Sequence, residues 1–233
     1  MFSISLEIPV VIFYSKFMEN QLIRTFGRIH GKKLSARQSW LVDNLLPKLA
    51  PGPANDRKIL EIGFGGGEHL LELSAQNPDA TIIGAEPFIN GVASLLSNIC
   101  SDNLTGNHET IVCPSFQNIR IWPDDVRKLF ADQPDMRFDE IWVLHPDPWP
   151  KARHEKRRLL SAGFLANLGE MLAPTGMIII GTDHYEYYDW IMDQVGKTNL
   201  ATADYKSPIV DTRYKQKNMA QTATPKYIVL KNS

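Results

Sequence analysis

The strongest restriction on the fold comes from an apolar segment that ends in a run of glycines. Residues 58–63 (KILEIG) have the length and apolar character of a buried β-strand, and residues 63–67 (GFGGG) follow at once. Glycine tolerates positive φ and lets the backbone turn sharply, so a strand, a tight turn and a helix are expected in succession. The helix is expected to end before Asn77-Pro78.

The rest of the chain continues this alternation of strand and helix. Further strands are expected at 80–86, 118–122, 138–145, 177–182 (after a turn at 174–176) and 225–231, and helices from Ser35, at 89–102, after Asp125, at 157–172 and at 184–196. Such alternation predicts an α/β fold with a doubly wound, Rossmann-like sheet, mostly parallel with an antiparallel last strand. Ligands of these sheets bind beyond the carboxyl ends of the strands, beside the first strand.

Acids around the glycine turn indicate the kind of ligand. Glu68 opens the helix where a dinucleotide-binding turn has its third glycine, and Glu61 lies on the preceding strand. An acid at a helix N-terminus opposes a pyrophosphate, which disfavours a nicotinamide oxidoreductase. A cationic ligand without phosphate fits better, and S-adenosylmethionine, with its sulfonium and amino groups, is one. Glu86, after the next strand, is placed to accept hydrogen bonds from ribose hydroxyls.

Residues 144–158 combine a stiff acidic loop with a basic run. Asp147 stands in the sequence PDPWP (146–150), whose prolines fix φ and extend their neighbours, so the segment is expected not to be helical. Five basic residues follow within eight positions: Lys151, Arg153, Lys156, Arg157 and Arg158. The combination indicates chemistry next to a polyanion. A stiff loop followed by a solvated charge run is the alternative.

The distribution of charge supports two different ligands. Residues 1–60 carry nine Lys and Arg against four Asp and Glu, residues 61–150 carry four against 14, and residues 151–233 carry 12 against eight. With a net charge of −1, the whole chain is not a basic nucleic-acid binder. An acidic centre between basic ends suits a cationic small ligand and an anionic macromolecule, and chance segregation is the alternative.

Two further acids follow strands and have two readings each. Asp125 precedes the helix after 118–122, and Asp183 follows the strand 177–182. Either residue could serve only as a helix N-cap, a role worth ~1 kcal/mol. Contact with the cofactor or the substrate is the other reading, because both residues are expected at the carboxyl edge of the sheet.

The compartment is inferred from what the sequence lacks. No apolar segment reaches the length of a membrane span, and the apolar patch at 8–13 lacks the features of a signal peptide. Cys100 and Cys113 form no metal-binding spacing and no disulfide framework, so a reducing compartment is the simpler assumption. A cytoplasmic protein without a metal or a membrane partner is therefore expected.

These motifs together resemble those of the bacterial tRNA (guanine-N7)-methyltransferases. The resemblance covers about residues 24–231 and is carried by EIGFGGG (61–67), EPF (86–88), PDPWPK (146–151), RHEKRR (153–158) and TD (182–183). It implies a class I methyltransferase that transfers a methyl group from S-adenosylmethionine to N7 of the variable-loop guanine of tRNA, with no obligatory protein partner. The implied organisation is an extension (1–20), a basic arm with a helix (21–52) and a methyltransferase domain (53–233).

The resemblance also implies roles for individual residues. Asp147 matches the catalytic acid. The positions matching the cofactor pocket are Glu61, Gly63, Gly65, Glu86, Asp125 and Asp147, and those matching substrate or RNA contacts are Lys151, Arg153, Lys156, Arg157, Arg158, Asp183, Thr212, Arg213 and Lys215. Lys215 departs from the family, which usually carries Glu there. Another class of N-methyltransferase and an inactive RNA-binding module are the alternative functions.

Overall fold

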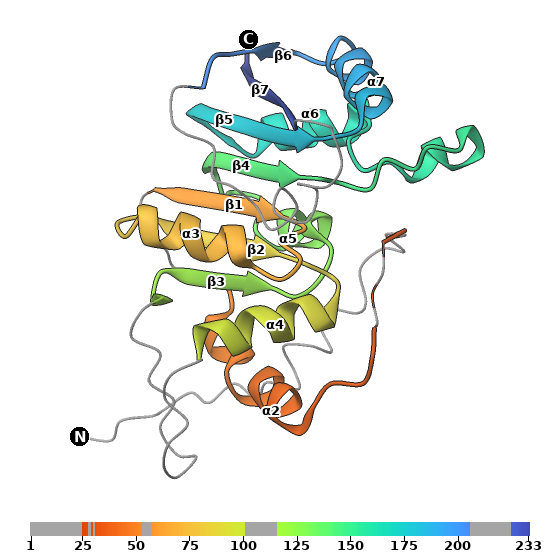
Figure 1. Cartoon of the computed structure of the whole chain (residues 1–233). Helices are drawn as coiled ribbons and strands as arrows, with labels where there is room; N and C mark the ends of the chain where they lie inside the picture. Colours follow the sequence, from red (N-terminus) through yellow and green to blue (C-terminus); the bar gives the residue numbers. More distant parts are fainter. Residues whose placement is uncertain (1–24, 28, 30, 53–56, 101–115, 206–224) are drawn as a thin grey trace.

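The computed structural model describes residues 25–27, 29, 31–52, 57–100, 116–205 and 225–233, and a seven-stranded sheet with helices on both faces dominates it (Figure 1). The strands are β1 (Lys58–Ile62), β2 (Thr81–Ala85), β3 (Ile119–Trp122), β4 (Phe138–Leu144), β5 (Leu172–Thr182), β6 (Leu200–Thr202) and β7 (Lys226–Asn232). Their order is β3-β2-β1-β4-β5-β7-β6. β1 to β5 are parallel, and β7 runs antiparallel to β5 and β6. The predicted doubly wound sheet with an antiparallel last strand is confirmed.

The helices form two layers, one on each face of the sheet (Figure 1). One layer holds α2 (Ala36–Asn44), the 3₁₀ helix η1 (Leu46–Leu49), α3 (Glu68–Gln76) and α4 (Ile89–Ile99), and the other holds α5 (Val126–Asp132), α6 (Ala162–Glu170) and α7 (Tyr185–Val195). Alternate strand residues point to opposite layers. Leu60 and Ile141 accordingly pack with α5 to α7, while Ile59 and Trp142 pack with α2 to α4. The sheet is therefore buried on both faces, which holds its carboxyl edge rigid.

A local signal starts α2 where the sequence predicts. Ser35 forms a capping box with Gln38: the Ser35 hydroxyl accepts from Gln38 N at 3.2 Å and the Gln38 amide oxygen accepts from Ser35 N at 3.0 Å. α2 then packs against α4 through Leu41 and Leu45, which are buried in the same core cluster as Val92. The arm thus leads into a helix that is part of the core. The boundary expected at residue 53 lies outside the described residues.

The expectation that the proline-bounded segment 146–150 is not helical is confirmed. Residues 146–150 belong to no helix or strand, and the 3₁₀ helix η3 (Ala152–Arg157), which was not predicted, follows them. Bonds such as Arg158 N to Glu155 O, at 2.9 Å, close it. Its first residue comes after Pro150, so no proline obstructs it. α6 in turn begins only at Ala162, later than the expected 157.

The C-terminal half differs from what the sequence indicated at three further points. The turn expected at 174–176 lies inside β5, whose pairing with β4 shifts between Phe138–Leu172 and Glu140–Met177, so the extra residues form a bulge. β6 has only three residues, too few to show an alternating pattern. His184, and not Asp183, is the N-cap of α7, and its Nδ1 accepts from Tyr187 N at 3.3 Å.

The expectation about the cysteines is wrong. Cys100, at the C-terminal end of α4, is in a disulfide. Sequence spacing does not reveal which sulfur atoms the fold brings within bonding distance. Cys113 lies outside the described residues. The cysteines therefore carry no argument about the compartment. Among the helices of the described ranges, none has both the length and the apolar character that a membrane span requires.

Candidate active site

A cleft of about 1030 Å³ opens at the carboxyl edge of the parallel strands, where the topology predicts the ligand. The ends of β1, β2 and β4, the loops after β3 and β4, and the arm before α2 form its walls. Its lining includes Thr25, Phe26, Gly63, Glu86, Asp125, Arg127, Asp147, Trp149, Lys156, Arg157 and Arg158. Segments more than 100 residues apart in sequence therefore meet at one site.

The glycine turn reaches this cleft at Gly63, which lines it. Gly63 and Gly65 have φ of 76° and 56°, values that a residue with a side chain rarely adopts. A Cβ at either position would meet no atom within 4 Å, so the backbone is open to a ligand. Behind the turn, Gly91 of α4 lies so close that its Cβ would be 2.3 Å from Gly65 O. α4 thus packs directly against the turn.

Glu86 is a buried acid held by two backbone donors. Its Oε2 accepts from Gly65 N and its Oε1 from Phe88 N, each at 2.8 Å. Burial raises the pKa of Glu86; the two hydrogen bonds oppose this, and the negative charges of Glu61 and Asp147 add to it. Each carboxylate oxygen retains a lone pair for a further donor, such as a hydroxyl. Glu86 thus holds the glycine turn through Gly65 N and can still accept hydrogen bonds from the hydroxyls of a ligand.

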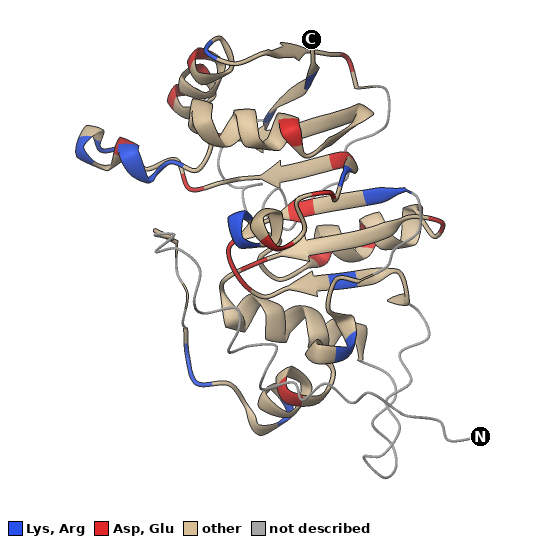
Figure 2. Cartoon of the chain, turned by 180° about the vertical axis from the view of Figure 1, so that it is seen from behind, with Lys and Arg blue, Asp and Glu red and all other residues tan. Residues whose placement is uncertain are grey.

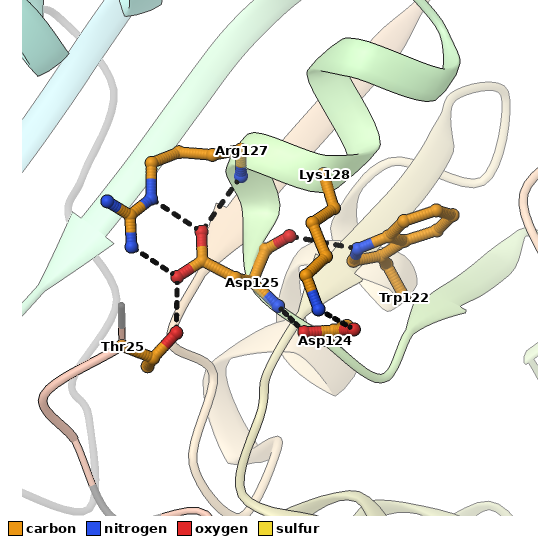
Figure 3. A network of polar contacts seen from close by, with 6 residues as sticks. All are labelled: Thr25, Trp122, Asp124, Asp125, Arg127 and Lys128. Carbon is orange, nitrogen blue, oxygen red and sulfur yellow. Dashed lines mark hydrogen bonds and ion pairs between the residues drawn. The ribbon is translucent and has the colours of Figure 1, made fainter. Parts of the chain in front are cut away.

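Asp125 is the N-cap of α5, which confirms the structural reading of this residue (Figure 3). Its Oδ1 accepts from Arg127 N at 3.0 Å and Arg127 Nε at 2.8 Å, and its Oδ2 accepts from Arg127 Nη2 at 2.7 Å and Thr25 Oγ1 at 2.8 Å. Burial alone would raise the pKa of Asp125, but the bonds from Arg127 and Thr25 outweigh it and lower the pKa. The same contact raises the pKa of Arg127. All four acceptor positions are filled, so a ligand could contact this carboxylate only if Arg127 or Thr25 moved.

The loop around Asp125 is itself fixed (Figure 3). Trp122 Nε1 donates to the Asp125 carbonyl at 3.1 Å, and the Asp124 carboxylate accepts from Asp125 N at 2.6 Å and Lys128 Nζ at 2.7 Å. Thr25 and Arg127 were not singled out from the sequence. Thr25 lies 100 positions from Asp125, and no local pattern connects them.

Asp147 stands exposed in the cleft on a loop bounded by two strained residues. His145 and Trp149 have φ of 49° and 41°, the left-handed region that costs a residue with a side chain about 1–2 kcal/mol. His145 N donates to Gly181 O at 2.8 Å, which ties the start of the loop to β5. Such strain persists only where surrounding contacts impose it, and it often occurs at functional sites.

Five of the described residues that were predicted for the site lie outside the lining of the cleft: Glu61, Gly65, Lys151, Arg153 and Asp183. Glu61 is 3% exposed and faces α3, with Oε2 at 3.2 Å from His69 Nδ1. Asp183 Oδ1 lies 3.9 Å from Nδ1 of His145. Burial lowers the pKa of His145, and the charge of Asp183 opposes this shift. Asp183 therefore approaches the site through His145, which lines the cleft, whereas Glu61 approaches His69 of α3.

The basic run divides by exposure. Lys151, Arg153 and Lys156 are exposed on η3 and the residue before it, whereas Arg157 and Arg158 are half-buried. Figure 2 shows Lys and Arg gathered on η3, which projects from the carboxyl edge of the sheet, with Asp and Glu along that edge. A cationic projection thus adjoins a cleft that is lined by both acids and bases. The predicted contacts Thr212, Arg213 and Lys215 lie outside the described residues. In the described ranges, no group of three His, Cys, Asp or Glu residues is arranged to hold a metal ion.

Comparison with known proteins agrees with this architecture. A family model described as "Putative methyltransferase" matches residues 55–226. The tRNA (guanine-N(7)-)-methyltransferase of Roseobacter denitrificans is 37% identical over 87% of this chain and 93% of its own length, and that of Granulibacter bethesdensis is 37% identical over 90% and 95%. Among solved structures, the 16S rRNA methyltransferase KamB shares the fold, with a TM-score of 0.55 and 14% identity over 88% of this chain and 99% of KamB. The chain therefore belongs to the tRNA (guanine-N(7)-)-methyltransferase family.

Proposed function

We propose that this protein methylates N7 of the variable-loop guanine of tRNA and that S-adenosylmethionine donates the methyl group. The observation that carries the proposal is the position of Asp147, on a strained loop that lines the same cleft as Glu86 and Gly63 and precedes a projecting cationic segment. This arrangement suits a small cationic donor on one side and a polyanion on the other. Curated relatives with high coverage bear the name of this activity.

The residues of the cleft fit S-adenosylmethionine. Gly63 and Gly65 leave room for close approach of a ligand to the backbone, and the Glu86 carboxylate has acceptor capacity for ribose hydroxyls. Glu68 at the first position of α3 disfavours a phosphate there. When bound, S-adenosylmethionine supplies a methyl group on a positively charged sulfur. Whether Asp125 also contacts it depends on the bonds that Arg127 and Thr25 make to this acid.

The reaction requires the protein mainly to position the two reactants and to stabilise the charge that develops on the base. Guanine N7 has an in-plane lone pair and carries no proton at neutral pH, so the nucleophile needs no general base. Methylation makes the base cationic, and the electrostatic interaction between the base and the Asp147 carboxylate becomes more favourable as that charge develops. Holding the two reactants in register supplies most of the remaining rate enhancement.

Binding of tRNA is assigned to the exposed cations of η3 and the residue before it, with the predicted Arg213 and Lys215 as further contacts. Lys151, Arg153 and Lys156 would follow phosphates and recognise the shape of the tRNA more than its sequence. The guanine takes part in tertiary pairing in folded tRNA and would have to be exposed, at a cost of about a few kcal/mol. Phosphate contacts would offset this cost. A tRNA substrate implies a cytoplasmic enzyme, and its action requires no protein partner.

Transfer of labelled methyl groups to total tRNA, followed by nucleoside analysis, tests the function. The expected product is 7-methylguanosine. A methyl group on an exocyclic amine would point to another class of N-methyltransferase. No transfer, together with no binding of S-adenosylmethionine in calorimetry, would leave an RNA-binding module.

The role of Asp147 is tested with Asp147→Ala and Asp147→Asn. Both should abolish turnover and leave tRNA affinity nearly intact, because the loop lies beside the basic segment and is not part of it. Wild-type activity in either variant would refute a catalytic role for this carboxylate.

A further inference from the structure

Arg158, the last residue of the basic run, is engaged by the protein itself. Its Nε donates to the Pro148 carbonyl at 2.9 Å, one residue after Asp147. Its guanidinium carbon lies 4.9 Å from the ring centroid of Trp190 and 5.5 Å from that of Tyr187. An arginine that stacks on two rings and bonds to a loop carbonyl is pre-organised by its environment. The side chain therefore connects the Asp147 loop to α7.

α7 provides a firm base for this connection. Tyr187 is fully buried and its ring centroid lies 5.7 Å from that of Trp190, with the planes tilted by 32°. Trp190 Nε1 also donates to Glu155 Oε1 at 2.7 Å. Trp190 thus contacts Glu155, which lies in η3, and Arg158, which directly follows η3. The short helix is held at two points against a helix of the core.

The loop requires such support because its backbone is strained. His145 and Trp149 both have positive φ, and without external contacts a loop with these residues would relax. Arg157 acts beside Arg158: its guanidinium carbon lies 5.0 Å from the Trp149 ring and 5.7 Å from the Phe26 ring. The end of the basic run thus holds the loop from two sides.

We infer that Arg158, seated on Trp190, is a positioning residue that fixes Asp147, and that it is not one of the tRNA contacts. The inference rests on the proposed function for the catalytic role of Asp147. The effect of Arg158 on the conformation of the loop does not depend on that function. If Arg158 turned toward a phosphate, it would lose its stacking and its bond to Pro148, and the loop would lose its support. Arg153 is exposed and its Nε donates to the neighbouring His154, at 3.3 Å, and not to the Asp147 loop, so Arg153 is the matched control.

Three variants separate positioning from charge: Arg158→Ala, Arg158→Lys and Arg153→Ala. Arg158→Ala should lower the single-turnover rate at saturating tRNA and S-adenosylmethionine by about 10²-fold, the loss that a displacement of about 1 Å can cause. Its tRNA dissociation constant and salt dependence should not change. Arg158→Lys keeps the charge but not the planar stack, so it should not restore the rate. Arg153→Ala should instead weaken tRNA binding and reduce the salt slope by about 1.

Hydrogen exchange of the peptide spanning 144–151 provides a readout that needs no reaction. In the protein without tRNA, exchange in this peptide should increase in Arg158→Ala and Trp190→Ala, and stay at the wild-type level in Arg153→Ala. Trp190→Phe keeps an aromatic ring under Arg158 and should lie near the wild type. Calorimetric binding of S-adenosylmethionine checks that each variant is folded; if Arg158→Ala is not, Arg158→Lys and Trp190→Ala carry the test.

Two results would overturn the inference. One is full activity of Arg158→Lys with a reduced salt slope in Arg158→Ala, because Arg158 would then act through its charge on RNA. The other is unchanged exchange of the loop peptide in folded Arg158 and Trp190 variants. If the wild type transfers no methyl group to tRNA, the proposed function fails, while the exchange contrast still decides whether Arg158 positions the loop.

Discussion

Replacing Asp125 tests whether the network around this acid stabilises the protein as its geometry indicates. The carboxylate caps α5, binds the Arg127 guanidinium through two nitrogens and accepts a hydrogen bond from Thr25 of the arm (Figure 3). Asp125→Ala removes all of these contacts. Asp125→Asn retains an oxygen that can cap the helix through Arg127 N but removes the negative charge. The pair therefore separates the cap from the ion pair.

The expected losses follow from the contacts. The cap contributes about 1 kcal/mol, and the hydrogen bond from the Thr25 hydroxyl about 1 kcal/mol. Because the Arg127 side chain is 34% exposed and can rehydrate, its ion pair is assigned less than about 1 kcal/mol. Asp125→Ala should thus lower the free energy of unfolding by about 2–3 kcal/mol, or the Tm by about 5–10 °C for a chain of this size. Asp125→Asn should cost about half as much.

The pH dependence gives a second, independent check. The pKa of Asp125 is lowered below its ordinary value of 3.8 in the folded protein. Its ionised form therefore contributes stability above the unfolded-state pKa, and this contribution is lost as the pH falls through the folded-state pKa. The stability difference between wild type and Asp125→Asn should be constant from neutral pH to about pH 5 and shrink below about pH 4.

Urea unfolding, followed by circular dichroism at a series of pH values, measures both quantities. Lys128→Ala, which removes a neighbouring surface ion pair with Asp124, is the control and should cost less than about 1 kcal/mol. If Asp125→Asn and Asp125→Ala unfolded at the wild-type urea concentration, the network would contribute nothing. A difference between wild type and Asp125→Asn that persisted unchanged to pH 3 would contradict the lowered pKa.

Two other outcomes follow from close approach and from exposure. Gly91→Ala would place a Cβ 2.3 Å from Gly65 O, so it should displace the glycine turn. Binding of S-adenosylmethionine, measured by calorimetry, should weaken at least about 10-fold, which corresponds to about 1.4 kcal/mol. Unchanged affinity would show that the turn is not part of the cofactor site. Replacing the exposed Lys151, Arg153 and Lys156 together by Ala should reduce the slope of log K for tRNA against log salt by about 2–3, and an unchanged slope would identify them as solvated surface charge.

The sequence predicted most of the fold because its signals are local. The apolar strands, the glycine turn and the caps at Ser35 and Asp125 depend on neighbours within a few residues, and each is where the pattern indicated. The errors arose where pairing overrides local preference. The residues at 174–176 have turn chemistry, yet β4 pairs alongside and absorbs them as a bulge in β5.

The sequence predicted several of the residues that line the candidate site, but not which residues contact one another there. Glu86 and Asp147 line the cleft as expected, whereas Glu61 faces His69 of α3 outside the lining. Strand alternation explains the difference, because Glu61 points toward the layer of α2 to α4. His69 was not singled out, although a βα unit brings the first turn of its helix back over the preceding strand.

The sequence by itself determined that this chain forms a doubly wound sheet, because periodicity, glycine and proline act over short distances. It also determined the family, through motifs such as PDPWPK and RHEKRR. Only the tertiary structure decided which charges are available to a ligand. Arg153 and Arg158 look equivalent in the basic run, but Trp190, 32 positions beyond Arg158, comes to lie under its guanidinium. A charge is free or occupied according to the partners that the fold brings to it, and those partners come from distant parts of the chain.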